Sequence, residues 1–125
     1  MNRLDTYLKV LHQVGCSTTV SDRDGHAVGN DKSIDQIIAL IRKVRSSDGK
    51  LMFIGNGGSA GIASHMAIDY SKNGRFPSLA FNDGSALTCL SNDLGYENVF
   101  SEQVKLHGRS GDLLVAISSS GASEN

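Results

Sequence analysis

The sequence predicts an α/β fold in which a parallel sheet is flanked by helices. Three short apolar segments indicate strands, at residues 51–54, 78–81 and 112–117. Helical patterns lie between these segments, and alternation of strands with helices is typical of parallel sheets with right-handed connections. The almost unbroken apolar run of the third segment fits a strand that is buried on both faces.

The first 32 residues are expected to form one helix and a loop. Residues 1–14 have helical periodicity, and Gly15 is expected to end this helix. The apolar face of the helix comprises Leu4, Tyr7, Leu8 and Leu11. Residues 15–32 are polar and rich in glycine, which predicts a loop. We interpret His26 in this loop as a solvated histidine, because no ligand partner lies at a recognisable spacing.

Residues 33–125 are expected to contain the sheet. A second helix should begin after Ser33, a residue type that favours the N-cap position. Its apolar stripe comprises Ile34, Ile37, Ile38 and Ile41. The Ile-rich face suggests a buried contact, and another subunit could provide it.

Further helices are predicted after each of the first two strands. One follows the first strand and ends near Asn73 and Gly74, residues that favour a C-cap. A short helix is expected at 85–91, a polar connector at 92–97 and another helix at 99–107. No helix follows the third strand, and three strands leave an edge that is normally covered. We therefore expect this sequence to be a truncated piece of a longer domain.

Composition excludes several classes of protein. The chain has 125 residues, enough for one domain, and a formal net charge of −1 without a basic run, which argues against nucleic acid as a partner. No apolar stretch is long enough to cross a bilayer, and the N-terminus lacks the apolar core of a signal peptide. The two cysteines lack metal-type spacing and are interpreted as reduced thiols. These observations favour a cytoplasmic protein.

Two polar turns follow strands and predict a phosphate site. The first, Gly55-Asn56-Gly57-Gly58-Ser59, leads into a helix whose N-terminal N–H groups favour anions. The second contains Ser118, Ser119, Ser120 and Ser123. Together the turns could bind one phosphate, although simple strand–helix connections remain the alternative. The glycine spacing matches neither the Walker loop nor the dinucleotide fingerprint.

His65 and Asp69 are four residues apart and therefore share one helix face. Such a pair can coordinate a divalent metal or act as acid and base, and the alternative is a hydrogen-bonded surface pair. Asn92 and Asp93 could reach sugar hydroxyls, or they form an ordinary turn. Tyr96 is interpreted as a residue of local structure, as is the glutamate after it.

Several motifs resemble the sugar isomerase (SIS) domain, and in particular its phosphoheptose isomerase branch, the sedoheptulose 7-phosphate isomerases. The motifs are GNGGSA, SHMAIDYSKNG, LSNDLGYENVFSEQV and GDLLVAISSSGASEN. The resemblance covers Ile34 to the end of the sequence. It implies a flavodoxin-like three-layer sandwich whose N-terminal helices form a bundle in a homotetramer. Residues 33–125 would be the N-terminal portion of the SIS domain.

The resemblance also implies roles for individual residues. His65 matches a zinc-ligand histidine, and Asp69 stands where many members have a glutamate that serves as ligand and base. Because aspartate is one methylene shorter, its carboxylate would sit differently over the substrate. Substrate contacts would come from Asn56, Gly57 and Gly58, phosphate contacts from Ser59, Ser118, Ser119, Ser120 and Ser123, and sugar hydroxyl contacts from Asn92 and Asp93.

The expected function is aldose–ketose isomerisation of sedoheptulose 7-phosphate to a heptose 7-phosphate for surface-polysaccharide precursors. The family's other two zinc ligands, a glutamine and a histidine, lie beyond Asn125, so the 125 residues alone are expected to show little turnover. One alternative is a non-catalytic SIS module that binds phosphosugars or associates with a replication initiator. Another is an isomerase of a different phosphosugar.

Overall fold

The computed structural model describes residues 2–125. Contacts between residues divide the chain into two compact units, Met1–Leu40 and Ile41–Asn125. The first unit holds a helix, a short hairpin and the start of a second helix. The parallel sheet lies in the second unit, together with the cavity that we describe below.

In the first unit, helix α1 (Arg3–Cys16) begins with a capping box. The Asn2 side chain accepts a hydrogen bond from the Asp5 N–H at 2.9 Å, and the Asp5 carboxylate accepts one from the Asn2 N–H at 3.4 Å. Strands β1 (Val20–Ser21) and β2 (Ala27–Val28) pair antiparallel. Helix α2 (Asn30–Ser46) follows them.

Two expectations for this segment are wrong. Residues 15–32 are not all loop, because β1 and β2 form a hairpin whose turn is organised by Asp22. The Asp22 carboxylate accepts hydrogen bonds from the N–H groups of Asp24 and His26, both at 2.9 Å. Ser33 is not the N-cap, since α2 begins three residues earlier. The buried Ser33 hydroxyl instead donates to the Asn30 carbonyl at 2.6 Å.

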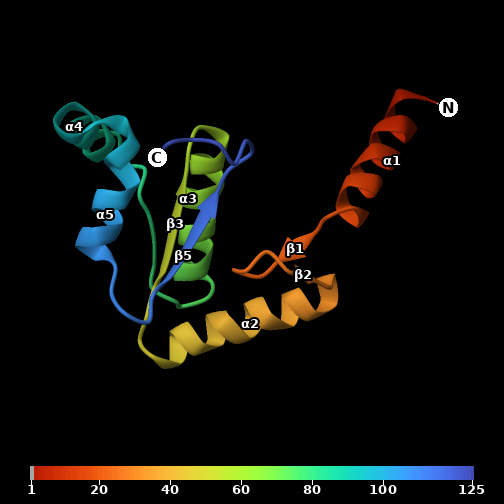
Figure 1. Ribbon diagram of the computed structural model, residues 1–125, viewed down its shortest axis with the longest axis horizontal. Helices are drawn as coiled ribbons and strands as arrows, with labels where there is room; N and C mark the ends of the chain where they lie inside the picture. Colours follow the sequence, from red (N-terminus) through yellow and green to blue (C-terminus); the bar gives the residue numbers. More distant parts are fainter. Residues whose placement is uncertain (1) are drawn as a thin grey trace. The chain divides into compact units, whose positions relative to one another are not determined.

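The predicted parallel sheet is confirmed in the second unit. Strand β3 (Leu51–Gly55) lies between β4 (Ser78–Ala80) and β5 (Leu113–Ile117), and both pairings are parallel. Figure 1 shows β3 and β5 side by side. Parallel strands end at a common edge, so the chain leaves β3 and β5 on the same side of the sheet.

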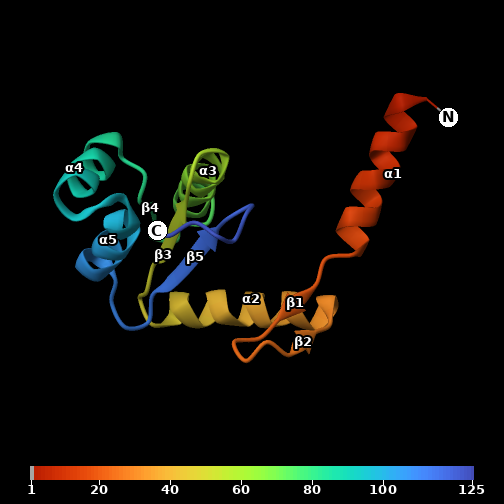
Figure 2. The same ribbon diagram turned by 45° about the horizontal axis from the view of Figure 1, so that its top comes forward.

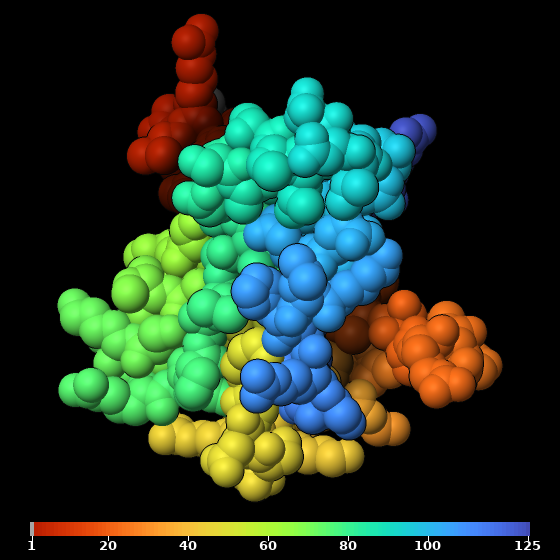
Figure 3. Space-filling view, turned by 90° about the vertical axis from the view of Figure 1, so that its left-hand side faces the viewer, coloured from red at the N-terminus to blue at the C-terminus, as the bar shows by residue number. Residues whose placement is uncertain are grey.

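Helices cover both faces of the sheet, as Figures 1 and 2 show. Helix α3 (Gly58–Lys72) covers one face. Helix α4 (Gly84–Leu94), the short helix η1 (Tyr96–Asn98) and α5 (Val99–His107) follow in the chain. Helices α4 and α5 pack on the opposite face and form much of the surface turned to the viewer in Figure 3.

The side chains of β3 point alternately to the two faces of the sheet and so contribute to the core on both. Leu51 and Phe53 pack with Ala63 and Ala67 of α3. The intervening Met52 packs with Val99 and Phe100 of α5 and with Phe81. Because successive side chains of a strand point to opposite faces, one continuous apolar strand supplies both layers. This packing fixes the direction in which the carboxyl end of β3 points.

Helix α4 is longer than the sequence indicates. The expected short helix at 85–91 runs on through Asn92 and Asp93, so the connector predicted at 92–97 is wrong in its first half. The Asp83 side chain caps the N-terminus by accepting a hydrogen bond from Ala86 N–H at 2.9 Å. Gly95 ends the helix with a φ of 88°, a conformation that glycine adopts without strain.

Candidate functional site

The carboxyl ends of β3 and β5 bring the two polar turns together. Gly55 and Ile117, the last residues of the two strands, are register partners. Between the turns lies a cavity of about 240 Å³. Six of the predicted site residues line it: Asn56, Ser59, Ser118, Ser119, Ser120 and Ser123. No charged side chain lines this cavity within the described chain, so its polar character comes from hydroxyl and carboxamide groups.

Glycines make the first turn possible. A Cβ at Gly55 would lie 2.9 Å from the carbonyl oxygen of Ile117 and 2.8 Å from the Cβ of Ser59, which is too close for any other residue. Gly57 has a φ of 54°, a left-handed conformation that favours glycine. Gly57 and Gly58 do not line the cavity but form the N-cap and first residue of α3. They place Ser59 in the first turn of that helix.

The second turn presents serine hydroxyls. The Ser118 Oγ accepts a hydrogen bond from Gly121 N–H at 2.9 Å, and the Ser120 Oγ accepts one from Ala122 N–H at 3.3 Å. A serine hydroxyl that accepts through a lone pair can still donate its proton. These two hydroxyls are therefore oriented by the backbone and available as donors to an anion.

Two residues that contact Asn56 were not predicted as site residues from the sequence. The Tyr96 hydroxyl donates to Asn56 Oδ1 at 2.9 Å, and the Asn56 Nδ2 donates to Asn125 Oδ1 at 2.8 Å. Tyr96 therefore does more than shape local structure, contrary to our expectation. The partners are 40 and 69 residues from Asn56 along the chain, so no local spacing indicates these contacts.

The His65–Asp69 pair lies on α3 outside the cavity. The imidazole Nε2 is 3.3 Å from the Asp69 carboxylate, and the side chains are 73% and 45% exposed. Asp69 also accepts a hydrogen bond from the Asn73 carboxamide at 3.3 Å. The pair presents one nitrogen and one carboxylate, ligand types that zinc accepts. It provides two ligands, whereas zinc usually takes four.

Asn92 and Asp93 lie on α4 and do not line the cavity between the turns. The Asn92 carboxamide donates to the Asp93 carboxylate at 2.9 Å. Asn92 lines a separate, more open hollow, to which Tyr96 also contributes. Tyr96 therefore connects the surroundings of Asn92 with Asn56.

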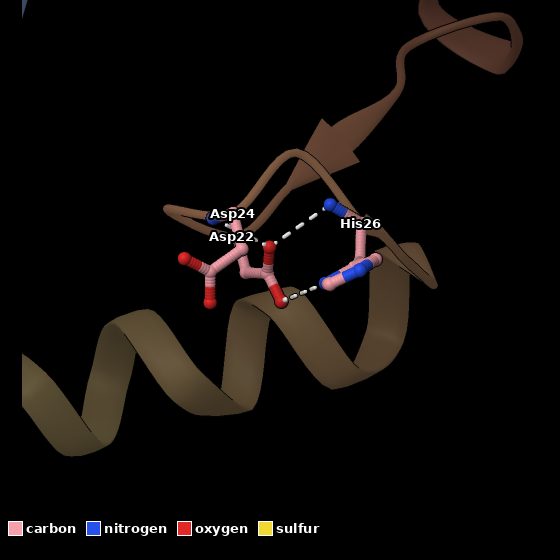
Figure 4. A group of neighbouring side chains, drawn as sticks. All are labelled: Asp22, Asp24 and His26. Carbon is pink, nitrogen blue, oxygen red and sulfur yellow. Dashed lines mark hydrogen bonds and ion pairs between the residues drawn. The ribbon is translucent and has the colours of Figure 1, made fainter.

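A second possible cation site lies in the first unit. Asp22, Asp24 and His26 have ligand atoms within 4.8 Å of one another, and in residues 2–125 they form the only cluster of three such side chains. Figure 4 shows them on the β1–β2 turn, where the Asp22 carboxylate contacts both the backbone and the ring of His26. All three are exposed, so this cluster could hold a metal only at the surface. His26 thus has neighbours that its spacing did not suggest.

Comparison with known proteins identifies the family. A family model described as the SIS domain matches residues 25–125. The chain belongs to the SIS domain family. This SIS chain is 36% identical over 137 residues to a phosphoheptose isomerase of Chlorobium phaeobacteroides, an alignment that covers 89% of the chain and 61% of the relative. It is 47% identical over 101 residues to a phosphoheptose isomerase of Rhodospirillum rubrum, and this alignment covers 74% of the chain and 53% of the relative.

Solved structures support the same assignment. The structure of phosphoheptose isomerase GmhA from Neisseria gonorrhoeae superposes with a TM-score of 0.69 at 43% identity, over 73% of this chain and 50% of that one. A phosphoheptose isomerase from Francisella tularensis has the same fold, with a TM-score of 0.74 at 24% identity, covering 100% and 66%. The SIS chain spans about half the length of most of the curated relatives it matches. None of the helices in residues 2–125 could span a membrane.

Proposed function

We propose that this protein is a phosphoheptose isomerase, which interconverts sedoheptulose 7-phosphate and a heptose 7-phosphate used for surface-polysaccharide precursors. The observation that carries the proposal is the cavity at the ends of β3 and β5, where serine hydroxyls from two turns meet beside the N-terminus of α3. Relatives named phosphoheptose isomerase, at 36% to 47% identity, support the choice of reaction and sugar.

The cavity suits the phosphate of the substrate. Ser118 and Ser120 have hydroxyl protons free to donate, and Ser59 lies in the first turn of α3, where the helix dipole favours a negative charge. Hydroxyl and backbone donors bind phosphate without a cationic side chain when several of them converge. The sugar chain would extend from this anchored phosphate.

Asp69 is proposed as the base. It would remove a proton from C1 of the ketose, next to the C2 carbonyl, and the electron pair of that C–H bond would form a C1–C2 double bond. The π pair of the carbonyl would move to O2, which takes up a proton from an acid or from water, and the product of this step is an enediol. Return of a proton to C2 and loss of the O1 proton would give the aldose. A second acid is required for that return, and the resemblance assigns this role to a histidine outside this sequence.

Zinc is the proposed metal, and the His65–Asp69 pair fits two of its ligand positions. The ligand atoms of the pair are already 3.3 Å apart and exposed. Bound zinc would polarise the carbonyl and so favour removal of the neighbouring proton. We propose zinc at α3 rather than at the Asp22 cluster, because His65 of α3 matches a zinc-ligand histidine of the family that this chain resembles.

A homo-oligomer, proposed to be a cytoplasmic homotetramer, would explain the location of the pair. Asp69 is ten residues beyond Ser59, which separates them by about 15 Å along the helix. The pair and the cavity of one chain are therefore apart, and the pair of one copy would complete the cavity of another. Large apolar side chains exposed on α1 and α2 offer a surface for such assembly.

A non-catalytic phosphosugar-binding or initiator-associating module is the second candidate. The observation that favours it is the position of Asp69, exposed and outside the cavity. In this case the cavity would bind a phosphosugar, but no proton would be transferred. An isomerase of another phosphosugar is the third candidate, and the choice of substrate in the assay tests it.

Turnover of sedoheptulose 7-phosphate by the full-length protein, of which this sequence is expected to be a part, tests the proposal when measured with and without zinc. We expect Asp69→Asn to abolish turnover, because the carboxylate proposed as base and zinc ligand is lost. Phosphosugar binding should stay within about threefold of wild type, because Asp69 does not line the cavity that would hold the phosphate. Asp24→Asn, which changes a carboxylate of the exposed cluster, is the matched control and should keep both turnover and zinc dependence.

The outcomes separate the candidates. Binding without turnover in the wild-type protein would favour the binding module. If the protein turns over only a different phosphosugar, the proposed substrate is wrong but the proposed isomerisation stands. Turnover that no longer depends on zinc in Asp24→Asn would move the metal to the β1–β2 turn.

A further inference from the structure

Three distant segments converge on the side chain of Asn56. Asn56 belongs to the turn after β3, Tyr96 to η1 and Asn125 to the segment after β5. The Tyr96 hydroxyl donates to Asn56 Oδ1 at 2.9 Å. The carboxamides of Asn56 and Asn125 bond reciprocally, with Nδ2 of Asn56 donating at 2.8 Å and Nδ2 of Asn125 donating at 3.2 Å. Side-chain networks of this kind fix orientation where single contacts do not.

We infer that Tyr96 and Asn125 are positioning residues that hold the Asn56 carboxamide as a hydrogen-bond donor to an oxygen of the bound sugar. The inference rests on the proposed function, because it assigns the ligand of the cavity to the phosphosugars. It adds the two residues that hold the Asn56 carboxamide and the direction in which its hydrogen bond to the sugar runs.

The hydrogen bonds that the Asn56 carboxamide already makes determine whether it can donate to a ligand or accept from one. A carboxamide oxygen has two lone pairs, and Asn56 Oδ1 accepts from both Tyr96 and Asn125. Its Nδ2 has two protons, of which one goes to Asn125. The other proton has no partner in residues 2–125, and Asn56 lines the cavity. Asn56 can therefore offer one N–H to a ligand and no acceptor.

This arrangement prepares the site before the ligand binds. The residues before and after Asn56 in the sequence are glycines, so neither has a side chain that could restrain the carboxamide. Tyr96 and Asn125 provide this restraint instead. A side chain that must be ordered by the ligand weakens binding, whereas one that is already held does not. Ser59 and the serines of the second turn would contact the phosphate, so loss of the Tyr96 contact should affect the sugar and not the phosphate.

The Tyr96→Phe variant tests the inference cleanly. It removes only the hydroxyl, and the residue is 52% exposed, so no buried packing is lost. We would measure dissociation constants by calorimetry for sedoheptulose 7-phosphate, fructose 6-phosphate and inorganic phosphate. The proteins are wild type, Tyr96→Phe, Asn56→Ala and the double variant. Tyr7→Phe, at a tyrosine of α1 that is 61% exposed, is the matched control.

We expect Tyr96→Phe to weaken phosphosugar binding about three- to tenfold and to leave inorganic phosphate unchanged. Asn56→Ala should weaken phosphosugar binding at least as much. In the double variant the tyrosine change should add nothing, because Tyr96 acts through Asn56. Tyr7→Phe should behave like wild type.

Other results would overturn one proposal or both. An undiminished effect of Tyr96→Phe in the Asn56→Ala background would overturn the positioning role, as would equal weakening of inorganic phosphate or no effect in either background. If the wild type binds only fructose 6-phosphate and the variants behave as expected, the proposed heptulose substrate is wrong and the positioning role stands. A wild-type protein that binds neither sugar phosphate would overturn both.

Discussion

Lys50 and Asp112 form an ion pair that joins the amino ends of β3 and β5, the two strands whose carboxyl ends border the cavity. The side chains are 18% and 5% exposed. The Asp112 carboxylate also accepts hydrogen bonds from the N–H groups of Lys50 at 2.9 Å and Arg109 at 2.7 Å. Burial raises the pKa of Asp112, but the hydrogen bonds and charge of Lys50, with the Arg109 N–H, hold the pKa below its usual value of 3.8.

This pair makes stability depend on pH. A carboxyl group whose pKa is lowered by folding stabilises the protein above its unfolded pKa, and the contribution is lost as pH falls through the folded value. Asp112→Asn should lower the free energy of unfolding by about 1–3 kcal/mol near pH 7, because it leaves Lys50 without its charge partner. The difference should shrink as the pH falls below 3.8 and through the folded pKa, which urea denaturation at about pH 7 and at a descending series of pH values below 3.8 would measure.

Asp24→Asn is the control for this experiment, because the Asp24 side chain is 62% exposed. It should change stability little at any of these pH values. If Asp112→Asn lowers the free energy of unfolding by the same amount under acidic conditions, the shape of this side chain and not its charge stabilises the protein.

Gly55 should not tolerate a side chain. Gly55→Ala would place a Cβ against the Ile117 carbonyl and the start of α3, so we expect a loss of about 1–3 kcal/mol and weaker phosphosugar binding. Gly61→Ala is the matched control in α3, where a Cβ would meet open space. It should stabilise the helix by about 0.5–1 kcal/mol. Thermal unfolding would compare the two, and similar melting temperatures would contradict the close approach.

Ser120 should contribute to phosphate binding. Ser120→Ala removes a hydroxyl that the Ala122 N–H orients, and we expect about three- to tenfold weaker binding of both inorganic phosphate and sugar phosphate. Ser101→Ala removes a hydroxyl on α5, far along the chain from both turns, and serves as control. Isothermal titration calorimetry measures both. If both variants bind phosphate like wild type, the second turn does not hold the anion.

The apolar stripe of α2 should mediate self-association. Ile34 and Ile37 are 55% and 52% exposed in the isolated chain, which is unusual for adjacent isoleucines on one helix face. Ile37→Asp should therefore lower the oligomeric state seen by sedimentation, whereas Gln36→Asp, one position away, should not. An unchanged sedimentation profile for Ile37→Asp would exclude this face from the interface.

Much of the fold follows from the sequence because it depends on local pattern. The continuous apolar run of β3 matches its burial on both faces, and alternation with helices dictates parallel pairing. The expectation that β5 is buried on both faces is wrong, because Leu113, Val115 and Ile117 pack against the core whereas Leu114 and Ala116 are exposed.

The other incorrect predictions concern segments whose backbone structure depends on hydrogen bonds of particular side chains or on a particular glycine. Asp22 builds a hairpin turn through its own hydrogen bonds, and Asp83 and Gly95 set the limits of α4.

The site is less predictable than the fold. Glycine and serine clusters after strands suggested two turns, and the register of Gly55 with Ile117 places them around one cavity. The contacts of Tyr96 with Asn56 depend on tertiary packing over 40 residues and leave no sequence signal. The position of Asp69 outside the cavity could not be predicted either. Helical spacing shows that Asp69 lies on the same helix face as His65, but it does not show which part of the protein that face contacts.

The uncharged lining of the cavity has a kinetic consequence. Because no lysine or arginine of residues 2–125 lines the cavity, only the dipole of α3 would attract an anionic ligand, and electrostatic steering should raise its association rate little. Hydrogen bonds from neutral donors act over short distances, so ionic strength should alter affinity much less than it does in sites built from arginine or lysine. A phosphosugar held by these residues would stay bound almost equally well in dilute buffer and in concentrated salt.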